Sequence, residues 1–251
     1  MRKPSLYLNL CSEFFDLDKP FAHLHEYAFY LQYISKTNGS ILEPMCGTGR
    51  YLIPFLEDGY SIDGFDASPF MLSALKNKCV QKNLTPHVWQ QFLEEVETTK
   101  QYDLIFIPDC SFCLFLDTAH IALCLKKIYS LLSSGGTFVF DLETIYSVPA
   151  HVGIWQGKAY TKENGQLLIF NMLPLPVKNN IATVICRYEL VEATHIIKTE
   201  VEYFQIKLYE QTEMDALLHN AGFKNIKRLK AYDATVEPSM RDHTIVYECT
   251  K

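Results

Sequence analysis

Apolar and polar positions along residues 40–140 fall into two alternating kinds of segment. Short runs of aliphatic, β-branched and aromatic residues, the composition of strands, are separated by longer stretches whose apolar residues recur at helical spacing. Strands that alternate with helices in this way lie parallel in one sheet, because each helix carries the chain back to the same end. The sequence therefore predicts an α/β core with strands at residues 41–42, 61–65, 87–92, 104–107 and 137–140.

The pattern changes after residue 141. Three long stretches follow that are rich in β-branched and aromatic residues, at 167–173, 181–192 and 195–208. Turn-forming residues separate them, among them Asn164-Gly165. Stretches of this kind predict long antiparallel hairpins, which the alternating core does not need.

Helical periodicity returns near the end of the chain. Thr212 and Asp215 have the spacing of a capping box, and Gly222 stands where a helix would end. Two more strands are expected at 224–229 and 244–249. The chain is therefore expected to divide into an N-terminal helical cap plus the core (1–150), an antiparallel β insertion that forms a substrate lid (151–209), and the final helix and strands of the core (210–251).

The composition narrows the classes of protein to consider. Of 251 residues, 48% are hydrophobic and 21% are charged, as in globular proteins, and no stretch approaches the roughly 18 uninterrupted apolar residues of a membrane helix. Arg2 and Lys3 precede a partly apolar stretch, but polar residues interrupt it before any cleavage site, so we expect a cytoplasmic protein. The net charge of −6 disfavours nucleic acid as a partner, although a basic cluster at 224–230 keeps an RNA substrate as a minor alternative.

The cysteines lie mostly in apolar runs, which is typical of reduced core residues and not of a secreted disulfide framework. Four residues nevertheless have a spacing that zinc sites can use: Cys110, Cys113, His120 and Cys124. A single C-x2-C pair specifies a metal weakly, and the last two residues fall in a predicted amphipathic helix. We therefore expect packing residues here and no metal.

A glycine turn with an acidic residue downstream indicates a site for an adenosine ligand. The turn Cys46-Gly47-Thr48-Gly49 follows an apolar strand, and Asp66 ends the next strand, seventeen residues after Gly49. Glycines let the backbone approach a ligand, and a carboxylate at that place can accept hydrogen bonds from both ribose hydroxyls. A dinucleotide fingerprint has a third glycine or alanine where Leu52 stands, which disfavours a pyrophosphate and hence a nicotinamide oxidoreductase.

The run Glu43-x-x-Cys46-Gly47-Thr48-Gly49 resembles motif I of the class I S-adenosylmethionine-dependent methyltransferases, with Met45 where that family usually has its first glycine. Four further segments are similar to the family in the same order, at residues 64–72, 102–109, 131–141 and 217–223. The resemblance implies a Rossmann-like sheet of seven strands, mostly parallel with the last strand antiparallel, helices on both faces and an inserted antiparallel β lid. It also implies S-adenosylmethionine as the cofactor and S-adenosylhomocysteine as the product.

The family's cofactor positions carry over onto this chain residue by residue. Asp66 would bind the ribose and Met71 would lie near the adenine. Gln91-Phe92 stands at the third-strand position beside the adenine, with Glu94 or Glu95 as the alternative if the alignment slips. The cofactor set implied by the resemblance is Glu43, Cys46, Gly47, Gly49, Asp66, Ala67, Met71, Gln91, Phe92, Pro108 and Asp109.

The methyl acceptor is expected between the strand ends and the inserted hairpins, where ligands of wound sheets bind. Phe15 stands where many small-molecule members of the family have a tyrosine over the methionyl end. Methyl transfer requires a base only if the nucleophile arrives protonated, and His151 is the candidate base. The candidates on the insertion are Trp155, Arg187, Tyr188 and Tyr203.

These features predict a methyltransferase that uses S-adenosylmethionine to methylate a nitrogen or oxygen of a small molecule, as a monomer or homodimer. The predicted lid resembles that of members acting on glycine or sarcosine nitrogen more than that of nucleic-acid groups, and a small phenol, carboxylate or alcohol is the next acceptor class. A non-catalytic adenosyl-ligand-binding or regulatory protein of the same fold is the alternative, because Met45 interrupts the glycine turn.

Overall fold

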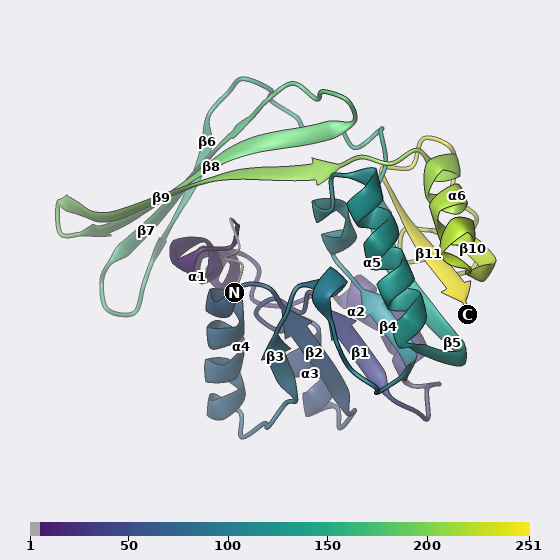
Figure 1. Cartoon of the computed structure of the whole chain (residues 1–251). Helices are drawn as coiled ribbons and strands as arrows, with labels where there is room; N and C mark the ends of the chain where they lie inside the picture. Colours follow the sequence, from purple (N-terminus) through teal and green to yellow (C-terminus); the bar gives the residue numbers. More distant parts are fainter. Residues whose placement is uncertain (1–5) are drawn as a thin grey trace.

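Two β-sheets form the framework of the chain in the computed structural model, which describes residues 6–251 (Figure 1). The larger sheet has seven strands in the order β10-β11-β5-β4-β1-β2-β3. Its strands are β1 (Ile41–Pro44), β2 (Ile62–Asp66), β3 (Val88–Gln90), β4 (Tyr102–Ile107), β5 (Leu132–Glu143), β10 (Lys224–Lys230) and β11 (Thr244–Thr250). The first five are parallel, whereas β11 is antiparallel to both its neighbours, which confirms the predicted Rossmann-like sheet.

Helices cover both faces of this sheet, and β4 shows why. The helices are α1 (Asn9–Asp18), α2 (Leu24–Ile34), α3 (Leu52–Glu57), α4 (Pro69–Gln81), α5 (Thr118–Leu131) and α6 (Gln211–Ala221), with the 3-10 helices η1 (Leu93–Glu95) and η2 (Ser111–Leu114). Ile105 and Ile107 pack with α5 and α6 on one face, while Leu104 and Phe106 pack with α2, α3 and α4 on the other, because successive side chains of a strand point in opposite directions. Among residues 6–251, no helix has the length and apolarity needed to cross a membrane.

The smaller sheet is antiparallel, lies between β5 and α6 in the sequence, and is called the insert below. Its strands, in spatial order, are β6 (Gln156–Thr161), β7 (Leu167–Pro174), β8 (Ile181–Glu192) and β9 (His195–Lys207). Leu10 and Phe14 of α1 pack in one apolar cluster with Leu168 and Tyr188 of the insert. We call the face that contacts α1 the inner face; in Figure 1 the insert lies at the top of the view with α1 beneath it.

Polar contacts also bind α1 to the insert. The backbone N–H groups of Tyr7 and Leu8 donate to the carboxylate of Glu202 at 3.2 and 2.8 Å, and that of Leu10 donates to Glu200 at 2.7 Å. The first N–H groups of a helix have no partner within the helix and favour negative charge. Because no side chain of α1 caps its own N-terminus, two glutamates of β9 supply the cap.

Some local predictions need correction. Strand β6 was not predicted, because its sequence is polar and lacks the β-branched run of the other strands. The capping box of Thr212 and Asp215 is wrong: α6 begins at Gln211 with Glu210 as its N-cap residue, and no side chain caps it. The buried Gln211 side chain bonds to two later segments, which fixes the helix start ahead of Thr212. Gly222 ends the helix with a φ of +107°, as predicted.

Candidate cofactor and acceptor site

The turn after β1 has a left-handed backbone at three positions, with φ values of +59° at Met45, +53° at Gly47 and +83° at Gly49. A Cβ on Gly47 would meet no atom within 4 Å, so the turn borders open space there. A Cβ on Gly49 would lie 2.9 Å from Ile53 Cγ1 and 3.0 Å from Leu75 Cγ, so packing requires glycine. Met45 keeps the glycine-like conformation of the family's turn at a cost of about 1–2 kcal/mol.

Asp66 ends β2 beside this turn. Its carboxylate accepts hydrogen bonds from the backbone N–H of Gly47 at 2.9 Å and of Ser68 at 2.8 Å. Burial raises the pKa of Asp66 to about 6, although these N–H donors act in the opposite direction. The carboxylate thus links the glycine turn to the start of α4 and is placed where the ribose of an adenosine ligand would bind.

The first turn of α4 completes this edge of the site. Ser68 is its N-cap residue, and its hydroxyl accepts from the backbone N–H of Met71, which is buried. The carbonyl of Ala67 accepts from the side chain of Gln90 at 3.1 Å, which ties β3 to the same loop. Cys46 is buried and lies against the backbone of Gly64 in β2, so its side chain packs between the first two strands.

Glu43 provides a direct test of whether the site fits the implied cofactor. Its side chain is buried at the end of β1, and within the described part of the chain its Oε2 has no hydrogen-bond partner. Burial raises the pKa of Glu43 well above its ordinary value, and the nearby Arg50 lowers it. A buried carboxylate oxygen with unused acceptor capacity fits the ammonium end of a methionyl group.

The loop after β4 brings the opposite side of the site close. Asp109 and Cys110 are both left-handed, with φ values of +62° and +52°, and Asp109 forms an ion pair with the buried Arg50. The guanidinium of Arg50 lies 5.5 Å from the ring centre of Phe15 and 5.3 Å from that of Tyr51. Phe15 and Asp109, both predicted site residues, are therefore joined through Arg50, a residue of the glycine turn that the sequence analysis passed over.

A buried acid of β5 holds this loop. The carboxylate of Asp141 accepts from the backbone N–H of Cys110 at 3.0 Å and from the hydroxyl of Tyr232. Burial raises the pKa of Asp141 to about 7. Two positions further along β5, the half-buried Glu143 also has a raised pKa, first because of burial and also because of the charge of Asp109, whereas His243 and Lys19 lower it. The ends of β4 and β5 thus form an acidic group that the sequence analysis did not assemble.

The third strand places Gln91 next to Asp66. The backbone N–H of Gln91 donates to the carbonyl of Asp66 at 3.0 Å, and its side chain donates to the carbonyl of Glu95 at 3.1 Å. Phe92 follows as the N-cap residue of η1. Of the two alternatives, Glu95 is exposed and Glu94 pairs with a histidine of α5. The adenine contacts of Gln91 and Phe92 stay predictions, and their position beside Asp66 is compatible with them.

Arg187 and Tyr203 lie on the outer face of the insert. Their immediate neighbours Tyr188 and Phe204 belong to the cluster around α1, and successive residues of a strand alternate between faces. The exposed fraction of Tyr203 is 62%. Both side chains therefore point away from α1, and the proposed acceptor site does not include them.

Trp155 and His151 lie in the connection between β5 and β6, and both are exposed. Their predicted roles stay predictions. Tyr7, in contrast, was not predicted. Its carbonyl accepts from the hydroxyl of Ser68 at 2.7 Å, which places Tyr7 beside the start of α4. Burial raises the pKa of its hydroxyl, and the charges of Cys11, Asp109 and Asp66 act in the same direction. No motif marks Tyr7 in the sequence, because its placement comes from packing and from the β9 carboxylate described above.

The core of the chain matches a methyltransferase domain family. Residues 41–136 match the family described as Methyltransferase domain. A proposed methyltransferase of Geobacillus sp. (strain WCH70) is 25% identical over 142 residues, which span 56% of this chain and 56% of that protein, so the match covers just over half of the relative's length. YqeM of Bacillus subtilis (strain 168), also named as a proposed methyltransferase, is 25% identical over 85% of this chain and 84% of its own.

Solved structures of similar fold cover nearly the whole chain. An S-adenosylmethionine-dependent methyltransferase from Clostridium acetobutylicum ATCC 824 superposes with a TM-score of 0.77 over 95% of this chain and 96% of its own, at 17% identity. The sugar N-methyltransferase KedS8 from Streptoalloteichus sp ATCC 53650 gives 0.74 over 98% and 97%, at 18% identity. S-adenosylmethionine is the cofactor of this family, and the open glycine turn, Asp66 and the Glu43 oxygen fit it. Residues 41–136 therefore match the methyltransferase domain family, and the chain has the fold of the class I S-adenosylmethionine-dependent methyltransferases.

Proposed function

We propose that the protein transfers the methyl group of S-adenosylmethionine to an amine nitrogen of a small molecule. The observation that carries the choice of nitrogen is the acidic group at the ends of β4 and β5, where Asp141 holds the loop that carries Asp109 and Glu143 ends β5. Such a group attracts a cationic ammonium and disfavours a carboxylate acceptor. Two neighbours of similar fold are named as acting on amines, the sugar N-methyltransferase KedS8 and an amino pentose methyltransferase, and these names support the same choice.

The cofactor would be held by the residues around the glycine turn. Asp66 would accept the ribose hydroxyls, Glu43 would face the methionyl ammonium, and Gln91-Phe92 would lie against the adenine. When bound, S-adenosylmethionine supplies a methyl group already activated by its sulfonium, so the chain must position a nucleophile and exclude water. Cys46, Ala67, Met71 and Pro108 would complete the lining of this side.

The acceptor would lie between the β4 and β5 ends and the inner face of the insert, covered by Tyr7 and Phe15. An amine that arrives as ammonium must lose a proton before it can attack. Glu143 is half-buried and its pKa is raised by burial and by Asp109, which suits a carboxylate that takes up this proton. We therefore place the base at Glu143, ahead of the exposed His151.

The test pairs amines with alcohols of the same carbon skeleton. The purified chain is incubated with methyl-labelled S-adenosylmethionine and matched amino sugars, sugars, amino acids and hydroxy acids, and labelled product is counted. We expect labelling of amines only, reduced by about 100-fold or more in Glu143→Gln and unchanged in His151→Ala. Labelling of hydroxyls alone would contradict the nitrogen assignment.

The same assay separates enzyme from binding protein. If the chain binds S-adenosylhomocysteine but labels neither the amines nor the hydroxyl compounds, the result favours a non-catalytic adenosyl-ligand-binding protein over a methyltransferase. If it binds neither S-adenosylmethionine nor S-adenosylhomocysteine in calorimetry, the residues around the glycine turn do not form the proposed cofactor site either.

A further inference from the structure

Three side chains with metal-binding chemistry meet at the junction of η1 and α5. Glu94 of η1 and His120 and Cys124 of α5 each bring one ligand atom, and these three atoms lie within 4.8 Å of one another. His120 Nε2 lies 3.1 Å from Glu94 Oε1. Carboxylate oxygen, imidazole nitrogen and thiolate sulfur are the donors that zinc binds in proteins.

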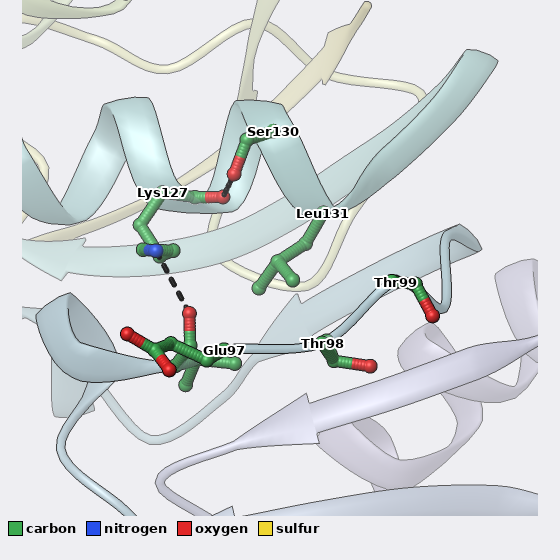
Figure 2. Close-up of a pocket in the computed structure, with 7 residues that line it drawn as sticks. Glu97, Thr98, Thr99, Lys127, Ser130 and Leu131 are labelled. Atoms are coloured by element: carbon green, nitrogen blue, oxygen red, sulfur yellow. Dashed lines mark hydrogen bonds between the residues drawn. The ribbon is translucent and has the colours of Figure 1, made fainter.

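The helix fixes two of the three ligands. His120 and Cys124 stand one turn apart, at i and i+4, so their side chains share a face of α5. Lys127 lies on the next turn of this face and donates to the carbonyl of Val96 at 2.8 Å. Figure 2 draws this contact as the dashed line that starts at Lys127. The segment that carries Glu94 is thus held along α5 by a contact that does not involve the three ligands, which pre-forms the cluster.

The geometry is compatible with a metal shell. Two ligands bonded to one ion at roughly 2.0 Å in a tetrahedral arrangement lie about 3.3 Å apart, close to the separation of the His120 nitrogen and the Glu94 oxygen. Cys124 is fully buried, and Nε2 of His120 and Oε2 of Glu94 are buried too, although the His120 side chain as a whole is 30% exposed. The donor atoms therefore face the protein interior, and a solvent ligand would have to be enclosed together with the ion.

The charges of the cluster also suit a divalent ion. A carboxylate, a thiolate and a neutral imidazole together carry two negative charges, which one divalent cation neutralises. As the sulfur–metal bond forms, the Cys124 thiol releases its proton to solvent.

The cluster differs from the pattern visible in the sequence. The C-x2-C half of that pattern lies elsewhere, since Cys113 is buried at η2 and its sulfur accepts from the backbone N–H of Glu143. Only the H-x3-C half is used, and its third member comes from η1. Sequence spacing could not have revealed Glu94, because it precedes the pattern and reaches it through the fold.

We propose that Glu94, His120 and Cys124 form a site for a divalent zinc-like ion with water as the fourth ligand. The ion would join η1 to α5, next to the segment that carries Gln91 and Phe92. The metal site is independent of the proposed methyl transfer, because it shares no residue with the proposed cofactor site around the glycine turn.

The test uses cobalt(II) as a visible probe of the site. The full chain is stripped with a chelator, desalted, kept reduced with a non-thiol reductant and titrated with cobalt(II). We expect one equivalent to bind, with a thiolate-to-cobalt charge-transfer band that one equivalent of zinc abolishes. Cys124→Ser should lose the band, and His120→Ala and Glu94→Gln should each weaken binding by tenfold or more.

Cys113→Ser is the matched control, because it removes a buried cysteine of the neighbouring helix η2, outside the cluster. It should keep the band and the stoichiometry. Circular dichroism and S-adenosylhomocysteine binding establish that each variant is folded, and Glu94→Gln keeps the test valid if Cys124→Ser does not fold. Absence of stoichiometric cobalt binding by the wild-type chain, or a band that survives in Cys124→Ser, would overturn the proposal and leave His120 and Glu94 as an ion pair only.

Discussion

The larger sheet and the insert bury their strands in different ways. Both faces of the central strands β4 and β1 are covered by helices, so almost every side chain there is buried. The insert is covered by α1 on its inner face only, and its outer face exposes apolar side chains such as Ile197 (49%) and Val201 (51%). The larger sheet is therefore buried on both faces, whereas the insert is buried on one face only.

This difference implies that the larger sheet and the insert have separate roles in the proposed site. The two-sided sheet fixes the ends of its strands rigidly, and these ends carry Glu43, Asp66 and Asp141, which hold the turn and loop of the cofactor side. The insert is tied to α1 by two glutamates of β9 and contacts the core directly through Ile206, which packs against the core cluster. We expect changes in the core to act on folding and cofactor binding, and changes in the insert to act on the acceptor side.

The largest effect is expected in the two-sided core. Phe106 is fully buried, with its ring centre 5.5 Å from that of Tyr30 and 6.0 Å from that of Phe55. Phe106→Ala should lower the free energy of unfolding by about 3–5 kcal/mol, because it leaves a cavity in packed surroundings. Val201→Ala, on the exposed face of the insert, should change it by less than about 0.5 kcal/mol. Urea unfolding measures both, and comparable losses would show that the insert is as tightly packed as the core.

The next effect concerns the cofactor edge of that core. Asp66→Ala removes the carboxylate that would bind the ribose and that accepts from Gly47 and Ser68. We expect affinity for S-adenosylhomocysteine to fall on the order of 100-fold, the loss of two charge-assisted hydrogen bonds. Calorimetry measures it, with Asp63→Asn as the control, since that acid points to Lys100 and Tyr102 instead. Equal losses in both variants would mean that folding and not ligand contact is being measured.

These two regions also differ in how far the sequence predicted them. The alternation of strands and helices and the Gly47, Gly49 and Asp66 pattern predicted the sheet and its cofactor edge, because those features arise from local backbone requirements. Which face of the insert points inward could not be predicted, since alternation fixes two faces but not which one α1 covers. Arg187 and Tyr203, candidates for the acceptor site, lie on the face away from α1. Tyr7 and Glu143 were not predicted, because only tertiary packing brings them to the site.

A smaller effect is expected where the insert contacts α1. Glu202→Ala leaves the backbone N–H groups of Tyr7 and Leu8 without their acceptor, so stability should fall by about 1–2 kcal/mol. Glu202→Gln keeps one acceptor oxygen and should lose less. Thermal unfolding measures both variants, and affinity for S-adenosylhomocysteine should change far less than in Asp66→Ala. A loss of affinity for S-adenosylhomocysteine as large as that of Asp66→Ala would show that the insert also determines cofactor binding, which would contradict separate roles for the two regions.

The pH dependence of cofactor binding should follow Asp66. Burial raises its pKa to about 6, so the carboxylate needed for the ribose is protonated as the pH falls through that value. Affinity for S-adenosylhomocysteine should be flat above pH 7 and fall by up to about tenfold per unit below 6. Asp66→Asn should remove this slope, whereas Asp141→Asn, which changes another buried acid whose pKa burial raises, should keep it. A slope that survives in Asp66→Asn would assign the titration to another group.

The smallest effect is expected on the outer face of the insert. Arg187 is 49% exposed in its ion pair with Glu189, two residues along the same strand, and exposed pairs contribute about 0–1 kcal/mol at most. Arg187→Ala should therefore change stability by less than about 0.5 kcal/mol and leave both cofactor affinity and amine methylation unchanged. Tyr188→Ala, the adjacent inward residue stacked 5.0 Å from Phe170, is the matched contrast and should impair both stability and acceptor turnover. If Arg187→Ala instead abolished methylation while stability held, the acceptor would have to lie against the outer face, and the one-sided reading of the insert would fail.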